Sequence, residues 1–82
     1  MARYFLHLRN GSDEFIDPEG ADLADIEALK KMVMRSVRDL LAGDIRNGVV
    51  DLRCRVDAED GNGVIVYTLP FEHAFSIIPG TA

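Results

Sequence analysis

Apolar residues recur at three- and four-residue steps between Asp22 and Arg46, and this period constrains the fold of the chain more than any other feature. The spacing predicts a long amphipathic helix with one face on a core. Asp22 is the predicted N-cap, because an aspartate accepts hydrogen bonds from the first helical N–H groups. Asn47-Gly48 is a helix stop signal, so the predicted end lies near Arg46. The predicted core stripe is Ile26, Leu29, Val33, Val37, Leu40, Leu41 and Ile45.

Alternating apolar and polar residues flank this helix on both sides and predict β-strands. Before the helix, residues 3–9 form the first predicted strand, and the turn residues 10–13 lead into a short second strand over residues 14–17. After the helix, strands over residues 49–57 and 64–69 are joined by a connection that contains two glycines. A hairpin is therefore predicted on each side of the helix.

This order of elements predicts a single α+β domain over residues 1–82 with a ββαββ arrangement. The four-stranded, mainly antiparallel sheet has one long amphipathic helix on one face. If the helix runs back along the sheet, the third strand enters antiparallel to the first. The strand order 2-1-3-4 is then antiparallel throughout.

A single cysteine and an acidic charge balance narrow the environment in which we expect the chain. Cys54 cannot form an intrachain disulfide, which fits a cytoplasmic location. No run of about 18 apolar residues is present, so we expect neither membrane insertion nor export. Nine Lys and Arg residues against fourteen Asp and Glu residues give a net charge of −5, which opposes attraction to nucleic acid and anionic lipid.

The sheet face away from the predicted helix contains apolar residues that one helix cannot cover. The fourth strand is apolar on both faces, and the first strand adds an aromatic residue and a histidine to the second face. Apolar surface of this kind marks association sites, so we predict a protein partner or a homodimer formed sheet to sheet or edge to edge. In the alternative, residues 71–78 fold back over the patch. The candidate interface is Phe5, His7, Val64, Val66 and Thr68.

Residues that could carry chemistry are scattered along the sequence. His7 could act as a general base or a ligand, but no nucleophile or acid is fixed beside it, and His73 lies on a predicted turn. Cys54 alternates with apolar residues, as a small buried side chain does. The acids of residues 13–19 offer ligands for calcium or magnesium, yet their spacing matches no EF-hand loop. Without a glycine-rich phosphate loop or a metal quartet, no catalytic residue, cofactor or metal site is predicted.

Three bases, Lys31, Arg35 and Arg38, lie on the solvent side of the predicted helix. They form a candidate polar partner surface that could meet phosphate or an acidic protein. Because the total charge is negative and no binding motif accompanies these bases, nucleic-acid binding is an alternative rather than the main prediction.

Four segments of the sequence together resemble a known family. They are the opening RYFLHLRNG of residues 3–11, the DPEG of residues 17–20, the DLL of residues 39–41 and the LPF of residues 69–71. These segments resemble a family of short alphaproteobacterial proteins classed as a domain of unknown function. The resemblance implies a bacterial, stand-alone protein and brings no activity or catalytic residue. Ala24 stands where such relatives would have a proline, near the start of the helix.

The predicted function is a non-enzymatic protein-interaction or regulatory module that acts through a partner or through its own dimer. Two alternatives remain open. One is a small metal-dependent or hydrolytic enzyme that uses His7 with the acids of residues 13–19. The other is a nucleic-acid-associated protein that uses the basic side of the helix.

Overall fold

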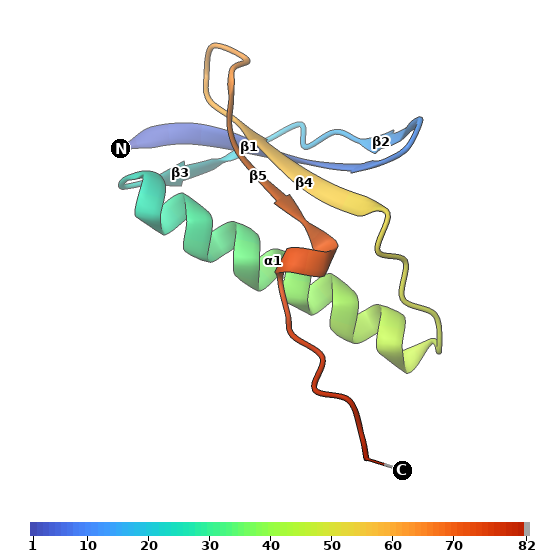
Figure 1. Ribbon diagram of the computed structural model, residues 1–82. Coiled ribbons are helices and arrows are strands. Elements are labelled where there is room, and N and C mark those ends of the chain that lie inside the picture. The colour runs from blue at the N-terminus through green and yellow to red at the C-terminus, as the bar shows by residue number, and fades with distance from the viewer. Residues whose placement is uncertain (82) are drawn as a thin grey trace.

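One long helix lies against one face of an antiparallel sheet, as a helical period between two alternating segments predicts (Figure 1). The computed structural model describes residues 1–81, and its architecture is α+β. The elements, in chain order, are β1 (Ala2–Asn10), β2 (Asp13–Phe15), β3 (Ala21–Leu23), α1 (Ile26–Arg46), β4 (Cys54–Glu59), β5 (Ile65–Pro70) and the short 3-10 helix η1 (Phe71–His73).

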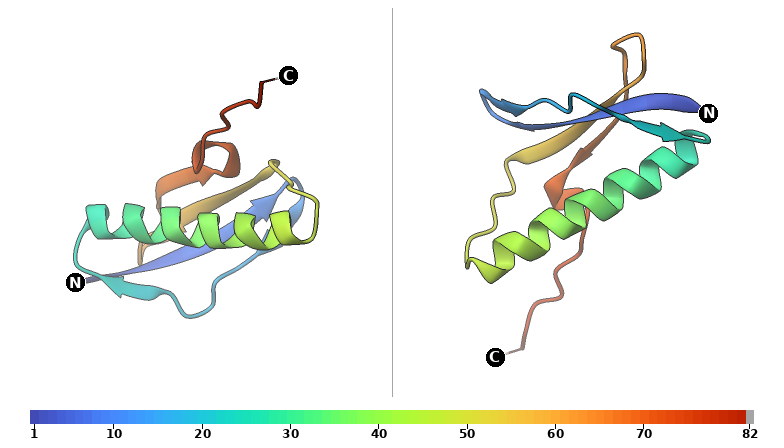
Figure 2. Two further views of the ribbon diagram at one scale, coloured as in Figure 1. Left: turned by 90° about the horizontal axis from the view of Figure 1, so that it is seen from below. Right: turned by 180° about the vertical axis from the view of Figure 1, so that it is seen from behind.

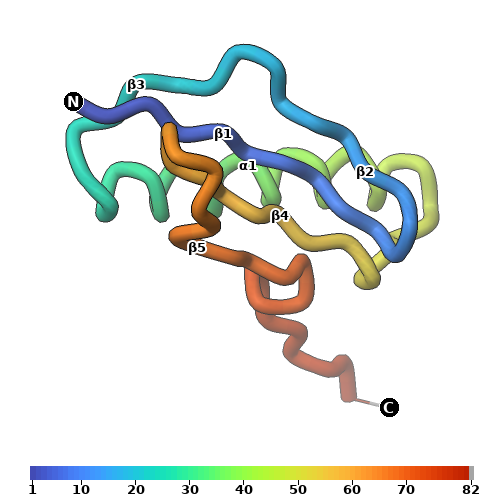
Figure 3. Tube along the Cα trace, turned by 90° about the horizontal axis from the view of Figure 1, so that it is seen from above, coloured from blue at the N-terminus to red at the C-terminus, as the bar shows by residue number. Residues whose placement is uncertain are grey.

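The first strand, β1, organises the sheet. It pairs antiparallel with β4, and β4 pairs antiparallel with β5, so the strand order is β2-β1-β4-β5. This order is the predicted 2-1-3-4 order. The sheet has five strands rather than four, however, because β2 and β3 both pair antiparallel with β1, along its two halves (Figure 3).

A loop over residues 16–20 separates β2 from β3, and the carboxylate of Asp17 holds this loop on β1. It accepts hydrogen bonds from the backbone N–H groups of Leu6 (3.2 Å), Glu19 (3.1 Å) and Gly20 (3.1 Å). Gly20 has a φ of +72°, and a Cβ there would lie 2.7 Å from the carbonyl oxygen of Tyr4. Only glycine fits such a left-handed position at so close an approach. The predicted strand over residues 14–17 therefore stops at Phe15, and a second short strand follows the loop.

The helix α1 begins three residues later than predicted. Its N-cap is Asp25, whose Oδ1 accepts a hydrogen bond from the N–H of Ala28 at 2.8 Å. Asp22, the predicted N-cap, lies in β3, where its carboxylate accepts two hydrogen bonds from Arg3. An aspartate held in a cross-strand ion pair cannot also cap the helix. The predicted end near Arg46 is confirmed.

The core lies between α1 and the inner face of the sheet. Burial of an aliphatic side chain stabilises the fold by about 1.5–3 kcal/mol. Three members of the predicted stripe, Ile26, Leu40 and Ile45, are instead exposed. Leu40 and Ile45 belong to the C-terminal half of α1, and Figure 1 shows that α1 and β1 diverge toward that end of the helix. The buried apolar side chains are Leu29, Val33, Val37, Leu41, Val56, Ala58, Leu69, Phe71 and Ala74.

The predicted third strand, residues 49–57, begins only at Cys54 and ends at Glu59. Asp51 is the cause, because its carboxylate accepts hydrogen bonds from the backbone N–H and the guanidinium of Arg53 and from the amide of Asn10. This local bonding replaces strand pairing, so Val50 and Leu52 lie in a loop with their side chains partly exposed.

The C-terminal segment packs on the helix side of the sheet (Figure 2). Phe71 and Ala74 are buried in the core, and Arg38 of α1 donates a hydrogen bond from Nε to the carbonyl of Ala74 at 2.7 Å. The alternative in which residues 71–78 cover the second sheet face is therefore wrong. Figure 3 looks onto that face, and no helix or tail lies over it.

Candidate interaction surface

The sheet face away from α1, here called the outer face, is closed by polar contacts rather than by apolar ones. His7 lies opposite Asp57 across β1 and β4, and Arg9 lies opposite Arg55. Asp57 is only 3% exposed although the outer face has no cover. The surrounding side chains that bury it are polar, so the predicted apolar patch does not extend over the middle of this face. The outer network comprises His7, Arg9, Glu14, Arg55, Asp57, Glu59 and Thr68.

Asp57 is the centre of this outer network. Its carboxylate accepts hydrogen bonds from Thr68 Oγ1 at 2.7 Å, Arg9 Nη1 at 2.8 Å and Arg55 Nε at 3.2 Å. Burial would raise the pKa of Asp57, but the hydrogen bonds from Arg9 and Thr68 and the charge of Arg55 outweigh burial and lower that pKa. Thr68 is thus a donor in the network and not part of an apolar contact surface.

Arg9 joins three carboxylates of the outer network. Besides Asp57, its guanidinium contacts Glu14 at 3.2 Å and Glu59 at 3.6 Å. The planar guanidinium has five donors in a fixed arrangement, which suits it to bridge acids from β2 and β4. These contacts tie three strands together on the outer face.

His7 is held inside the same network. Its Nδ1 accepts a hydrogen bond from the backbone N–H of Asp17 at 3.1 Å, and its Nε2 lies 3.4 Å from a carboxylate oxygen of Glu59. Only 8% of the side chain is exposed. Both ring nitrogens therefore have partners within the fold, and the geometry gives His7 a structural role in holding residues 16–20 against β1.

The remaining predicted interface residues have different surroundings. Phe5 is half-buried, with its ring close to Gly20. Val64 and Val66 are 55% and 38% exposed and lie in the turn before β5 and at the start of β5, where Ile65 pairs with Glu59 of the outer network. Of the predicted interface, the two valines alone present exposed apolar surface.

The other candidate residues do not converge. Cys54 is half-buried, and burial, with nearby Asp51 and Asp44, raises the pKa of its thiol, which disfavours the reactive thiolate. His73 is exposed in η1. Within residues 1–81, no three His, Cys, Asp or Glu side chains are grouped so that they could hold a metal ion. Two of the acids of residues 13–19 contact β1 instead: Asp17 binds backbone there, and Glu14 binds Arg9.

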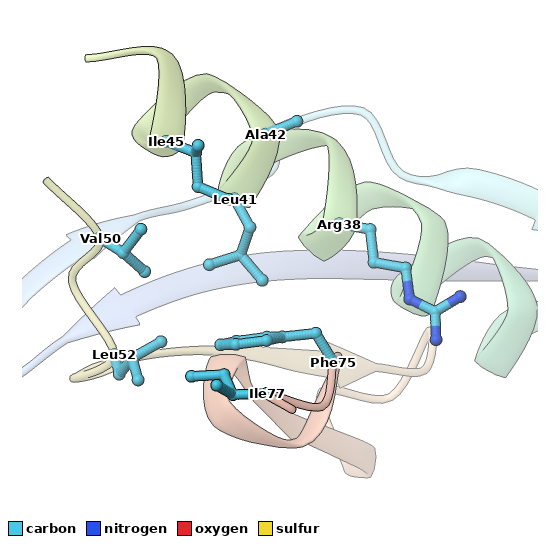
Figure 4. Close-up of a pocket in the computed structure, with 8 residues that line it drawn as sticks. All are labelled: Arg38, Leu41, Ala42, Ile45, Val50, Leu52, Phe75 and Ile77. Carbon is cyan, nitrogen blue, oxygen red and sulfur yellow. The ribbon is translucent and has the colours of Figure 1, made fainter. Parts of the chain in front are cut away.

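An apolar depression lies on the helix side, at the C-terminal end of α1 (Figure 4). Its volume is about 480 Å³. Leu41 and Ile45 face it from the helix, and Val50 and Leu52 face it from the loop before β4. Phe75 and Ile77 of the C-terminal segment form the opposite wall. These six residues define the apolar groove, and the stem of Arg38 lies at its rim.

Exposed apolar side chains surround the apolar groove. Ile45 is 68% exposed and Ile77 is 74% exposed. Val49, next to Val50, and Ile78, next to Ile77, are also exposed. This surface was not predicted from the sequence because it forms only where α1, a loop and the C-terminal segment meet in space. The signal that could have found it is the run of apolar residues at 49, 50 and 52, which continues beyond the helix stop.

Basic side chains are divided unequally between the sheet and the helix. Five of the nine bases form ion pairs with carboxylates: Arg3, Arg9, Lys30, Arg53 and Arg55. The other four have no carboxylate partner among the residues that the structure describes, and all four lie on α1 at positions that share one side of a helix. This basic stripe comprises Lys31, Arg35, Arg38 and Arg46, and it includes the three predicted partner-surface residues.

The comparisons with known proteins bear on the family alone. No α-helix in the described part of the chain, residues 1–81, has the length and apolar character needed to cross a membrane. The search of curated proteins and the search of solved structures each found no match. A family profile matches residues 3–72 and carries the description "Domain of unknown function (DUF6894)". Since this match covers far more than half of the chain, the whole of α1 included, the chain belongs to that family of domains of unknown function.

Proposed function

We propose that this domain is a protein-interaction module that binds its partner in the apolar groove. The observation that carries the proposal is the groove itself, where apolar side chains from three segments converge without a cover. Contiguous exposed apolar surface in a soluble domain marks a site of association. This places the proposed contact on the helix side, whereas the sequence analysis expected it on the outer face.

The shape of the molecule supports the same proposal. The radius of gyration is 13.9 Å, and the chain extends over 50 × 27 × 18 Å. A globular domain of this length has a radius of gyration of about 12 Å. Figure 1 shows that the end of α1 and the C-terminal segment stand away from the sheet. Residues of both segments line the apolar groove, so a bound segment would pack between them.

The state of the titratable side chains also favours binding over catalysis. His7 and Asp57, the buried polar residues, are both engaged in the outer network. The walls of the apolar groove carry no acid, histidine or cysteine. General acid–base or nucleophilic catalysis needs such a group within reach of the substrate. The groove therefore suits recognition of apolar side chains.

The test uses the full chain with single substitutions in two walls of the groove. Ile45→Glu and Ile77→Glu each place a charge on a side chain that is already largely exposed, so both variants should fold. Val64→Glu is the matched control, because Val64 is similarly exposed on the distant β4–β5 turn. Partners captured from the protein's own cells should be retained by the wild type and by the control, and lost by both groove variants.

Two outcomes would contradict this proposal. If the groove variants keep every partner and Val64→Glu loses them, the interface lies at β5. If no protein depends on the groove, and sedimentation shows a monomer whose groove variants behave like the wild type, the module has no such function. A wild-type dimer that Ile45→Glu converts to a monomer would identify a second copy as the occupant.

A further inference from the structure

We infer that the partner is an acidic amphipathic segment of another protein, whose apolar side chains enter the groove while its carboxylates meet the basic stripe. The inference rests on the proposed function and names the chemistry of its partner. Two features lie side by side on α1: the groove residues Leu41 and Ile45, and the bases Arg38 and Arg46. A segment lying along the end of α1 would contact both.

The first argument is that the fold does not explain the whole basic stripe. Arg38 binds the carbonyl of Ala74, and Arg46 lies in the last helical turn, where the helix dipole favours a cation. Lys31 and Arg35 have neither role. They are exposed, and the acids four residues away from them, Glu27 and Asp39, lie beyond ion-pair distance. An acidic partner would supply carboxylates that the fold does not bring to these bases.

The second argument is charge complementarity within a chain of opposite net charge. The net charge is −5, yet the bases that lack a carboxylate partner among residues 1–81 gather on one side of one helix. Such a local field steers acidic partners toward α1 although the molecule as a whole is acidic.

The third argument separates a protein partner from nucleic acid. Phosphate backbones offer negative charge but no aliphatic side chains to fill a groove walled by Val50, Leu52 and Ile77. The net charge of the chain also opposes the binding of a polyanion, because a polyanion interacts with charges over the whole domain. An acidic protein segment needs only a local contact and supplies the apolar side chains.

The fourth argument separates another protein from a second copy of this chain. The acids of this chain are largely engaged within the fold: Glu14 with Arg9, Asp22 with Arg3, and Asp51 with Arg53. Asp17, Asp25 and Asp60 bind backbone N–H groups. Five acids, Asp13, Glu19, Asp39, Asp44 and Glu72, have no such side-chain contact within residues 1–81, but they are spread over four segments of the chain and so do not form one acidic amphipathic segment.

The experiment uses the full chain and two designed 16-residue peptides as probes. Both peptides carry leucines at helical spacing, and their remaining positions are glutamate in one and lysine in the other. Binding is measured by fluorescence anisotropy at low and high salt, and the site is mapped by amide chemical shifts. The glutamate peptide should shift amides of the end of α1, of residues 49–52 and of residues 75–77. The lysine peptide should not bind, and a higher salt concentration should weaken the binding of the glutamate peptide.

A charge-matched pair of variants tests the basic stripe. R35Q/R46Q lowers the net charge by two, and S12E/N62E does the same at two exposed turn positions. The stripe variant should bind the glutamate peptide about threefold to tenfold more weakly, the effect of removing two surface ion pairs. The control should bind within about twofold of the wild type, since its charges lie on the β1–β2 and β4–β5 turns, outside the groove and the basic stripe.

Each alternative outcome would overturn the inference. The inference fails if the lysine peptide binds as well as the glutamate peptide, or if the glutamate peptide does not bind at millimolar concentration. It fails if R35Q/R46Q binds the glutamate peptide as tightly as the wild type does. It also fails if the basic stripe retains a mixed DNA oligonucleotide, or if the chain dimerises through the groove. The proposed function can survive such a failure. It stands if captured partners still depend on Ile45 and Ile77, and it fails separately if they do not.

Discussion

The outer face of the sheet and the basic stripe of α1 both carry several bases, but of these bases only those on the outer face form ion pairs with carboxylates of residues 1–81. On the outer face, Arg9 and Arg55 contact acids from neighbouring strands, and Asp57 is buried beneath them. On α1, the basic stripe has no carboxylate partner among residues 1–81. The comparison shows that charge composition alone does not locate a binding surface. Charges that the fold pairs stabilise the fold, and charges that it leaves unpaired are available to a partner.

The largest expected effect on stability comes from a substitution in the outer network. Asp57→Ala leaves the guanidinium of Arg9 and the hydroxyl of Thr68 without their acceptor, and removal of one partner from a buried charged network is strongly destabilising. Because Arg55 is partly exposed and water can replace some contacts, we expect a loss of about 2–3 kcal/mol in the free energy of unfolding. Urea denaturation measures this loss. Arg53→Ala, which removes an exposed ion pair, is the control and should change the midpoint little.

A smaller loss is expected at the histidine of the same network. His7→Ala leaves the backbone N–H of Asp17 without its acceptor and loosens residues 16–20 from β1. An unsatisfied backbone donor in a half-buried loop costs about 1–2 kcal/mol. Hydrogen exchange at the amides of residues 17–20 should rise in step with the loss of stability. Partner binding should stay within about twofold of the wild type, and a selective loss of binding or of an activity in a stably folded His7→Ala variant would give this residue a direct role.

Acid should destabilise the outer network and leave the basic stripe unaffected. Burial raises the pKa of Asp17, but the hydrogen bonds from Gly20, Leu6 and Glu19 outweigh it, so the pKa of Asp17, like that of Asp57, is lower in the folded chain. A lowered folded-state pKa contributes stability above the unfolded value of about 4, and this stability is lost as the pH falls through the folded value. Thermal denaturation between pH 6 and pH 2 should show this fall, and Asp57→Asn should reduce its slope. An equal slope in the variant would mean that Asp57 is not a source of the acid sensitivity.

The sequence predicted the parts of the fold that depend on periodicity. The helix end at Arg46, the core side chains Leu29, Val33 and Val37, and the antiparallel strand order all follow from local spacing and from chain connectivity. The strand β3 was missed because its three residues are too few to show a period. It forms since Asp17 holds the preceding loop on β1 through hydrogen bonds that join distant positions.

The candidate surface was harder to predict for a related reason. Thr68 and His7 were interpreted as apolar contact residues, but their roles depend on which side chains face them across β4 and β1, and cross-strand register is absent from the sequence pattern. The bases Lys31, Arg35 and Arg38 were recognised. What could not be recognised was that the fold leaves them without carboxylate partners while it pairs the bases of the sheet.

The smallest expected effect on stability sharpens the comparison most. K31Q/R35Q removes two bases from the basic stripe, and Arg9→Gln removes one from the outer network. Since Lys31 and Arg35 are exposed and lack carboxylate partners within ion-pair distance in residues 1–81, the double variant should stay within about 0.5 kcal/mol of the wild type. Arg9→Gln should instead lower the urea midpoint clearly, because Glu14, Asp57 and Glu59 lose their shared partner. A clear loss of stability in K31Q/R35Q would give the stripe a structural role and remove the contrast on which the proposed partner chemistry rests. Bases that do not stabilise the fold, yet lie together beside an open apolar groove, are the ones for which binding is the remaining physical explanation.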